Sequence, residues 1–136
     1  MESEFLSPTL RGLHYQYPQR QAKLVQVIRG KIYDVVVDIR YGSSTFGKWE
    51  GVDLSDGNKR QLFVPEGFAH GFCVLSESAL VHYKCSDFCA PESEGGILWR
   101  DPAIGIEWPL SDPLLSEKDN AYPFLSDVPA CRLPLY

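Results

Sequence analysis

The chain has 136 residues, of which 44% are hydrophobic and 23% charged, and its net charge is −5. This length suits one domain, the composition is that of an ordinary globular protein, and no apolar run is long enough to span a bilayer. The acidic balance argues against a nucleic-acid-binding protein, which normally carries a strongly basic surface. The first seven residues include two Glu and lack the basic and apolar regions of a secretion signal, so we expect a cytoplasmic protein.

Short runs rich in branched apolar residues recur along the chain, separated by clusters of Gly, Pro, Ser, Asp and Asn. They occupy residues 23–29, 31–39, 49–54, 61–64, 72–75, 79–85 and 104–108. Each run predicts a strand, and Gly30 predicts a turn between the first two. No stretch keeps the spacing of an amphipathic helix for three turns, which excludes a helical bundle. The sequence therefore favours one all-β domain over residues 1–136, built as an antiparallel sandwich, jelly roll or barrel.

The C-terminal part differs from this pattern. Residues 114–121 could hold a short helix, with Ser116 as its N-cap ahead of Glu117, Lys118 and Asp119. Residues 128–136 contain two Pro, and we expect them to lie over the surface.

The four Cys residues are expected to be reduced, buried thiols in a cytoplasmic protein. Two of them, Cys85 and Cys89, are four positions apart, but no second Cys or His pair stands at zinc spacing. We therefore expect no structural metal.

A few polar residues stand out as candidates for chemistry. The stretch T-L-R-G-L-H-Y-Q at residues 9–16 places Arg11 three positions before His14, although a lone His in a strand is more often structural. Lys23 shares its strand face with two Val residues, and a buried amine there needs an anionic partner. Arg11, Arg20 and Lys23 could together bind a small anion or simply form a solvated charged face, and the sequence leaves both interpretations open.

Five motifs in the same order give the chain a recognisable resemblance. They are R-G-L-H-Y-Q at residues 11–16, G-K-I-Y-D-V-V-V-D-I-R at 30–40, K-R-Q-L-F-V-P-E-G-F-A-H-G-F at 59–72, Y-K at 83–84 and L-S-E-K-D at 115–119. Over about residues 10–125 the chain resembles the dTDP-4-dehydrorhamnose 3,5-epimerase family. Members usually carry a few tens of residues before the R-G-L-H motif, so we expect this chain to lack the usual N-terminal segment.

The resemblance implies a cupin-type antiparallel jelly roll with at most a short C-terminal helix, a homodimer, and no metal or other cofactor. It also implies epimerisation at C3, C5 or both of a nucleotide-linked 4-keto-6-deoxy sugar, expected to be dTDP-linked. Both carbons flank the carbonyl, so loss of either proton gives an enolate. Such a reaction needs a base, an acid on the opposite face, and a cation near the carbonyl oxygen.

The resemblance also assigns roles to individual residues. His14 would be the base and Tyr83 the acid, with Asp119 as the carboxylate that partners His14 and Lys23 near the enolate oxygen. A further set would contact the nucleotide-sugar: Arg11, Gln16, His70, Glu94 and Lys118. At residues 88–89 the chain has Phe-Cys, where members often have two aromatic residues that include a Tyr.

Two other classes of function are alternatives to this one. A shortened cupin could bind a sugar nucleotide, or act as a partner subunit, with weak or no turnover. A metal-dependent cupin would need a His-x-His pair with a Glu and a further His, and His14, His70 and His82 do not form that pattern.

Overall fold

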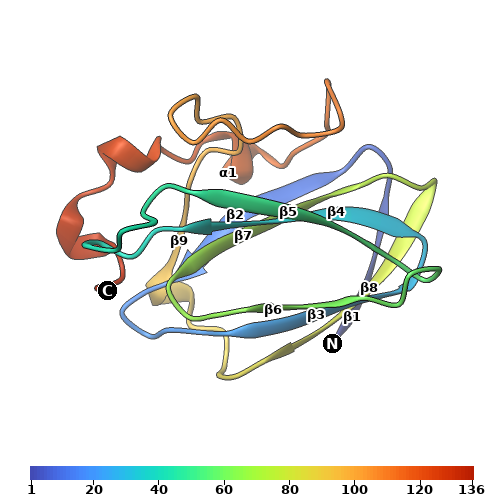
Figure 1. Cartoon of the computed structure of the whole chain (residues 1–136), viewed down its shortest axis with the longest axis horizontal. Coiled ribbons are helices and arrows are strands. Elements are labelled where there is room, and N and C mark those ends of the chain that lie inside the picture. The colour runs from blue at the N-terminus through green and yellow to red at the C-terminus, as the bar shows by residue number, and fades with distance from the viewer.

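The computed structural model describes all residues, 1–136, and consists of two antiparallel sheets that face each other (Figure 1). The five-stranded sheet has the order β5-β4-β7-β2-β9 and the four-stranded sheet the order β1-β8-β3-β6. The strands are β1 (Glu2–Leu6), β2 (Leu10–Gln16), β3 (Lys23–Arg29), β4 (Lys31–Asp38), β5 (Trp49–Ser55), β6 (Gln61–Val64), β7 (Phe68–Val74), β8 (Ser78–Cys85) and β9 (Glu94–Gly96). The predicted all-β antiparallel fold is confirmed.

Most predicted strands are confirmed with nearly the predicted bounds. Gly30 links β3 to β4, which belong to different sheets, so it reverses the chain between layers and not within a hairpin. Its φ is +94°, and a Cβ there would lie 2.3 Å from the carbonyl oxygen of Ser78. Only glycine fits this position without strain.

Two strand predictions need correction. Strand β7 begins at Phe68, four residues before the predicted start, because the turn ends at Gly67 with a φ of +88°. The predicted strand at 104–108 is wrong: these residues are irregular, and Ile104 is apolar because it packs into a core cluster. Strands β1, β2 and β9 mix polar and apolar residues and were not predicted.

The C-terminal segment is tied to the body of the protein. Helix α1 (Glu117–Asn120) is shorter than the predicted stretch, and its predicted N-cap is confirmed, since Ser116 Oγ accepts a hydrogen bond from the Asp119 N–H. The expectation that residues 128–136 lie on the surface is wrong in part, because Leu133 is only 3% exposed. The segment includes two 3₁₀ turns, Leu125–Asp127 and Ala130–Arg132.

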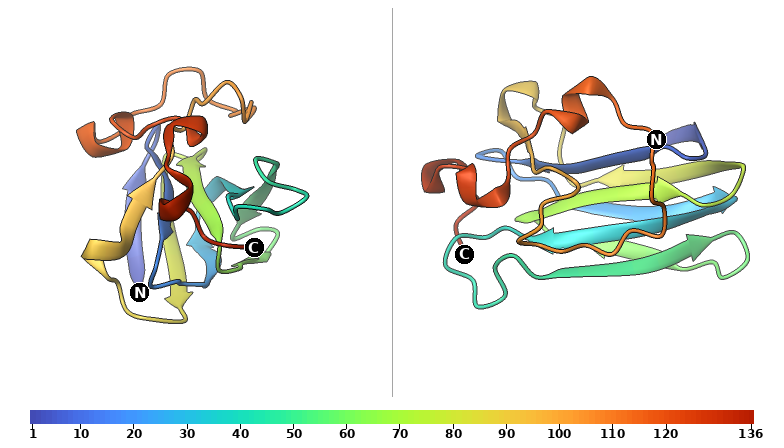
Figure 2. Two further views of the ribbon diagram at one scale, coloured as in Figure 1. Left: turned by 90° about the vertical axis from the view of Figure 1, so that its left-hand side faces the viewer. Right: turned by 90° about the horizontal axis from the view of Figure 1, so that it is seen from above.

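Successive side chains of a strand point to opposite faces of the sheet, and this alternation divides the core into two clusters. Odd-numbered residues of β4, such as Val35 and Val37, face a cluster that includes Leu125 and Leu133 of the C-terminal segment. Figures 1 and 2 show this segment, in orange and red, running across the five-stranded sheet. Even-numbered residues of β4 face the other sheet, where a second cluster includes Ile32.

Of the cysteines, Cys73 is buried, whereas Cys85, Cys89 and Cys131 are exposed, and all four are free thiols. The expectation of buried thiols is therefore correct only for Cys73. Burial raises the pKa of the Cys73 thiol to about 11. No helix is long and apolar enough to cross a membrane.

Candidate active site

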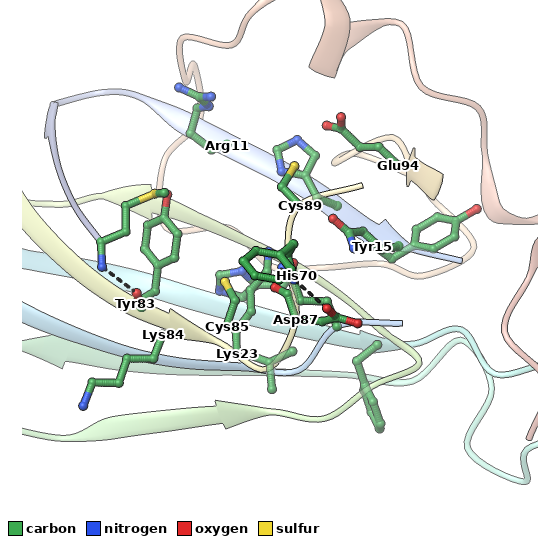
Figure 3. A pocket seen from close by; sticks show the side chains of 17 residues that line it. Arg11, Tyr15, Lys23, His70, Tyr83, Lys84, Cys85, Asp87, Cys89 and Glu94 are labelled. Carbon is green, nitrogen blue, oxygen red and sulfur yellow. Dashed lines mark hydrogen bonds between the residues drawn. The ribbon is translucent and has the colours of Figure 1, made fainter. Parts of the chain in front are cut away.

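A cavity of about 760 Å³ opens between the two sheets (Figure 3). A smaller hollow of about 120 Å³ shares its polar lining and reaches toward the apolar core at Phe5 and Phe72. Seven of the nine predicted site residues line the main cavity: Arg11, His14, Gln16, Lys23, His70, Tyr83 and Glu94. The two that do not are Lys118 and Asp119.

The two sheets contribute different polar groups to the cavity. The five-stranded sheet presents His14 from β2 and His70 from β7, which are direct partners in the strand register. The four-stranded sheet presents Lys23 from β3 and Tyr83 from β8. Figure 3 shows Arg11 and Tyr83 rising from opposite walls. The cavity therefore offers polar groups to two faces of a ligand.

His14 and Asp119 form a close pair. His14 Nε2 lies 2.8 Å from Asp119 Oδ1, and the Asp119 side chain is 3% exposed. The Gly12 N–H donates to Asp119 Oδ2 at 3.1 Å, and Arg11 Nε is 3.9 Å from the same oxygen. Burial alone would raise the pKa of Asp119, but the His14 hydrogen bond, assisted by these groups, lowers it. An ionised Asp119 keeps the proton on Nε2, which leaves the other ring nitrogen as the basic atom.

Lys23 is an ammonium group set among apolar and thiol side chains. It lies opposite Cys85 in β8 and opposite Val64 in β6. Burial lowers the pKa of Lys23, and the nearby Cys85 and Asp34 only partly oppose this effect. A cation held in a partly dry site interacts strongly with a negative charge that develops beside it.

The structure adds one charged residue that the sequence reasoning missed. Asp34 is fully buried in β4, and its Oδ1 lies 2.5 Å from Nε2 of His70. The two atoms are close enough for an ion pair, but their angles are not those of a hydrogen bond, so both Asp34 oxygens lack a donor. The sequence signal that could have indicated Asp34 is an acidic residue inside the apolar run K-I-Y-D-V-V-V-D-I at residues 31–39.

Two predicted substrate-binding residues have their polar atoms committed within the protein. Gln16 Oε1 accepts from the Ala90 N–H at 3.2 Å, and its Nε2 donates to the Gln19 carbonyl at 3.3 Å. Lys118 Nζ donates to Glu94 Oε1 at 2.6 Å. In this arrangement Gln16 fastens the loop at residues 86–90, and Lys118 reaches the cavity only through Glu94.

No group of three or more His, Cys, Asp or Glu side chains is arranged to hold a metal ion. The polar groups at the cavity include a histidine–carboxylate pair, a tyrosine hydroxyl and an ammonium group. Together these can remove a proton, supply one, and stabilise a developing negative charge.

Solved structures agree with this architecture over most of the chain. The dTDP-6-deoxy-D-glucose-3,5-epimerase of Legionella pneumophila Philadelphia 1, in complex with dTDP-4-keto-L-rhamnose, is 52% identical with a TM-score of 0.97, covering 100% of this chain and 73% of that one. A 4-keto-6-deoxy sugar epimerase from the novobiocin biosynthetic gene cluster of Streptomyces spheroides is 40% identical with a TM-score of 0.96, covering 100% and 69%. The chain thus has the cupin-type fold that its motifs indicated.

Curated relatives point to the same family. A dTDP-4-dehydrorhamnose 3,5-epimerase of Methanothermobacter thermautotrophicus is 52% identical over 131 residues, and one of Shigella flexneri is 60% identical over 111 residues. The alignments cover 94% and 81% of this chain, and it spans 71% and 61% of those relatives. The family model described as dTDP-4-dehydrorhamnose 3,5-epimerase matches residues 3–127. The chain therefore belongs to the dTDP-4-dehydrorhamnose 3,5-epimerase family.

Proposed function

We propose that this protein epimerises a dTDP-linked 4-keto-6-deoxy sugar at C3, C5 or both, through an enolate. The observation that carries the proposal is the arrangement around one cavity: His14 lies on the five-stranded sheet with Asp119 of helix α1 as its buried partner, and Lys23 and Tyr83 lie on the four-stranded sheet. Proton removal on one face and return on the other inverts a carbon only when acid and base stand on opposite sides of it.

The mechanism follows from these positions. The free imidazole nitrogen of His14 takes the proton beside the ketone, and the electron pair of the broken C–H bond moves onto the carbonyl oxygen. The Lys23 ammonium stabilises this enolate oxygen, while ionised Asp119 stabilises the imidazolium. Tyr83 then donates its hydroxyl proton to the opposite face of the carbon, and exchange with solvent restores both residues.

The remaining predicted residues would bind the nucleotide-sugar directly or shape the cavity around it. Arg11 is half exposed at the cavity wall, and its guanidinium can form paired hydrogen bonds to a phosphate. His70 is held by Asp34 at the centre of the cavity wall, where it could contact the sugar. Gln16, Glu94 and Lys118 would act mainly by fixing the loop and the rim of the cavity.

We further propose a homodimer that works in the cytoplasm. The dimer is supported by the open edges of the four-stranded sheet, β1 and β6, where Leu6 and Phe63 are about three-fifths exposed. The location is supported by three exposed cysteines that remain free thiols.

Proton NMR of dTDP-4-keto-6-deoxyglucose in deuterium oxide tests the proposed reaction. The wild-type protein should exchange deuterium into C3, C5 or both, and the labelled positions identify which carbons react. His14→Ala should abolish this exchange. Tyr83→Phe should still allow enolisation by His14 while slowing net inversion. A folded wild-type protein that binds dTDP but exchanges no proton would instead support a binding function without turnover.

A further inference from the structure

Tyr122 stands beside the candidate base without lining the cavity. Its ring centroid is 5.8 Å from that of His14, and the two planes meet at 74°, an edge-to-face arrangement. The side chains that line the main cavity and the hollow beside it do not include Tyr122. Tyr122 lines a separate hollow of about 210 Å³ instead, together with Gly96. The ring therefore meets His14 from outside the main cavity.

The backbone is shaped to admit this ring. In the pairing of β2 with β9, Gly96 is the direct partner of His14. A Cβ on Gly96 would lie 2.4 Å from carbons of the Tyr122 ring. Directly paired residues of antiparallel strands point their side chains to the same face of the sheet. Tyr122 thus fills the volume of the missing cross-strand side chain next to His14.

The same short segment of chain supplies both contacts to the imidazole. Helix α1 carries Asp119, whose carboxylate is hydrogen-bonded to His14 Nε2, and Tyr122 follows two residues after its end. The hydrogen bond fixes one atom of the imidazole but still allows the ring to rotate about that contact. The edge-to-face contact limits this rotation, so the two together define the orientation of the ring.

The hydroxyl of Tyr122 has no part in this arrangement. Its oxygen is buried and makes no hydrogen bond of normal geometry, although the Lys118 ammonium, which donates to Glu94, lies nearby. Burial raises the pKa of Tyr122, so the phenol stays neutral. A buried hydroxyl without a hydrogen bond costs stability, so we attribute the role of Tyr122 beside His14 to its aromatic ring.

We propose that Tyr122 is a positioning residue for His14, holding the imidazole in the orientation that proton abstraction requires. The predicted effect of Tyr122 on the reaction rate rests on the proposed epimerase function. Its predicted effect on the orientation of the His14 imidazole does not. A small misplacement of a catalytic group can slow a reaction by about 10²-fold. The predicted defect therefore lies in kcat and not in nucleotide binding.

Tyr122→Leu and Tyr122→Phe form the matched pair for the test. Tyr122→Leu removes the aromatic edge and should lower kcat by about 10-fold or more while leaving KM and the affinity for dTDP near wild type. Tyr122→Phe keeps the ring and should retain kcat within about twofold. Equal loss in both variants, or wild-type kcat in Tyr122→Leu, would overturn the proposal.

A second readout separates this inference from the proposed reaction. Nitrogen-15 NMR of His14 should show one tautomer, protonated at Nε2, in wild type and in Tyr122→Phe, and a mixture or averaged signals in Tyr122→Leu. If wild type shows no epimerisation, the proposed function fails while this spectrum still decides the positioning role. If Tyr122→Leu does not fold, Tyr122→Met replaces it, and an unchanged His14 spectrum in that variant counts against the proposal.

Discussion

Lys23 combines a cost to folding with a role in the proposed chemistry. Replacing it by Met in Lys23→Met should lower kcat by about 10²-fold or more, because the developing enolate oxygen loses its cation. The same change should raise the melting temperature, since burial lowers the pKa of Lys23 and thereby opposes its charged form. Activity and stability should therefore move in opposite directions, as measured by deuterium exchange and thermal denaturation.

The lowered pKa of Lys23 also predicts how the stability of the protein changes with pH. The folded-state pKa of Lys23 is lowered, so the unfolded chain binds its proton more tightly and the free energy of unfolding rises with pH up to about 10.4. Lys23→Met should flatten this rise relative to wild type. Lys84→Met is the matched control, because Lys84 lines the same cavity but is exposed. A kcat in Lys23→Met equal to that of the control would contradict the assigned role.

At the residue scale, most of the predicted site residues belong to the continuous motifs, although Asp34 was missed inside one of them. His14 and His70 sit in such motifs, and both line the cavity. Tyr122 has no local signal, because its place beside His14 depends on Gly96 in another strand. Gln16 was predicted to contact substrate, but its amide is engaged with the backbone, a commitment that only the folded loop creates. The catalytic roles themselves remain predictions.

Helix α1 positions the carboxylate of the candidate dyad although it has only four residues. So short a helix is not stable by itself and depends on its cap and its tertiary contacts. Ser116 Oγ accepts the Asp119 N–H at 3.1 Å, and Asp119 in turn is hydrogen-bonded to His14. The cap therefore acts on the site through the backbone of Asp119.

Ser116→Ala should cost about 1 kcal/mol of stability and lower kcat by several-fold, because the Asp119 backbone loses its anchor. Chemical denaturation and deuterium exchange measure the two effects. Ser116→Thr, which keeps a capping hydroxyl, should recover most of both. Ser126→Ala is an exposed control in a neighbouring 3₁₀ turn and should change neither. If Ser116→Ala is less stable but fully active, the N-cap stabilises the fold without affecting the candidate site.

Element by element, the strand signal is strongest where both faces of a strand meet a core. Strand β4 packs one face between the sheets and the other under the C-terminal segment, so its run of Val residues is unmistakable. The run at 104–108 is also apolar, but Ile104 is buried in a loop, and apolar content alone does not separate these cases. Strands β1 (E-S-E-F-L) and β9 (E-G-G) contain few apolar residues and gave no signal, whereas the other two edge strands, β5 and β6, contain enough to be predicted.

At the scale of the whole molecule, one ionic cluster joins the end of β4 to the chain's C-terminal residues. Arg40 donates to both oxygens of Asp38, at 3.0 and 2.9 Å, and its guanidinium lies 4.9 Å from the ring centroids of both Phe68 and Tyr136. Asp38 is 2% exposed, and the Ser43 hydroxyl also donates to it at 2.6 Å. This cluster and the backbone pairing of Tyr41 with Leu135 hold the C-terminal segment over the sheet.

Arg40→Met should destabilise the protein by about 3 kcal/mol. This value is at the lower end of the cost of breaking a buried ion pair, because the Arg40 side chain is partly exposed. Burial alone would raise the pKa of Asp38, but its hydrogen bonds to Arg40, Ser43 and Thr45 hold it well below its usual value. Asp38 thus stabilises the fold at pH values above about 4, and this contribution is lost as pH falls toward its folded pKa. Urea denaturation at pH 7 and at pH 3 should show a smaller pH dependence in the variant.

The double variant Asp38→Asn/Arg40→Met distinguishes the two sources of that loss. Most of the cost of Arg40→Met should come from leaving the Asp38 charge buried without its partner, and this cost disappears when residue 38 is neutral. The double variant should therefore be more stable than Arg40→Met alone. The deficit that remains combines the lost stacking of the guanidinium on Phe68 and Tyr136 with the hydrogen bonds from Ser43 and Thr45 that an Asn side chain cannot all accept. A double variant no more stable than Arg40→Met would contradict the assignment of the loss to the unpaired charge.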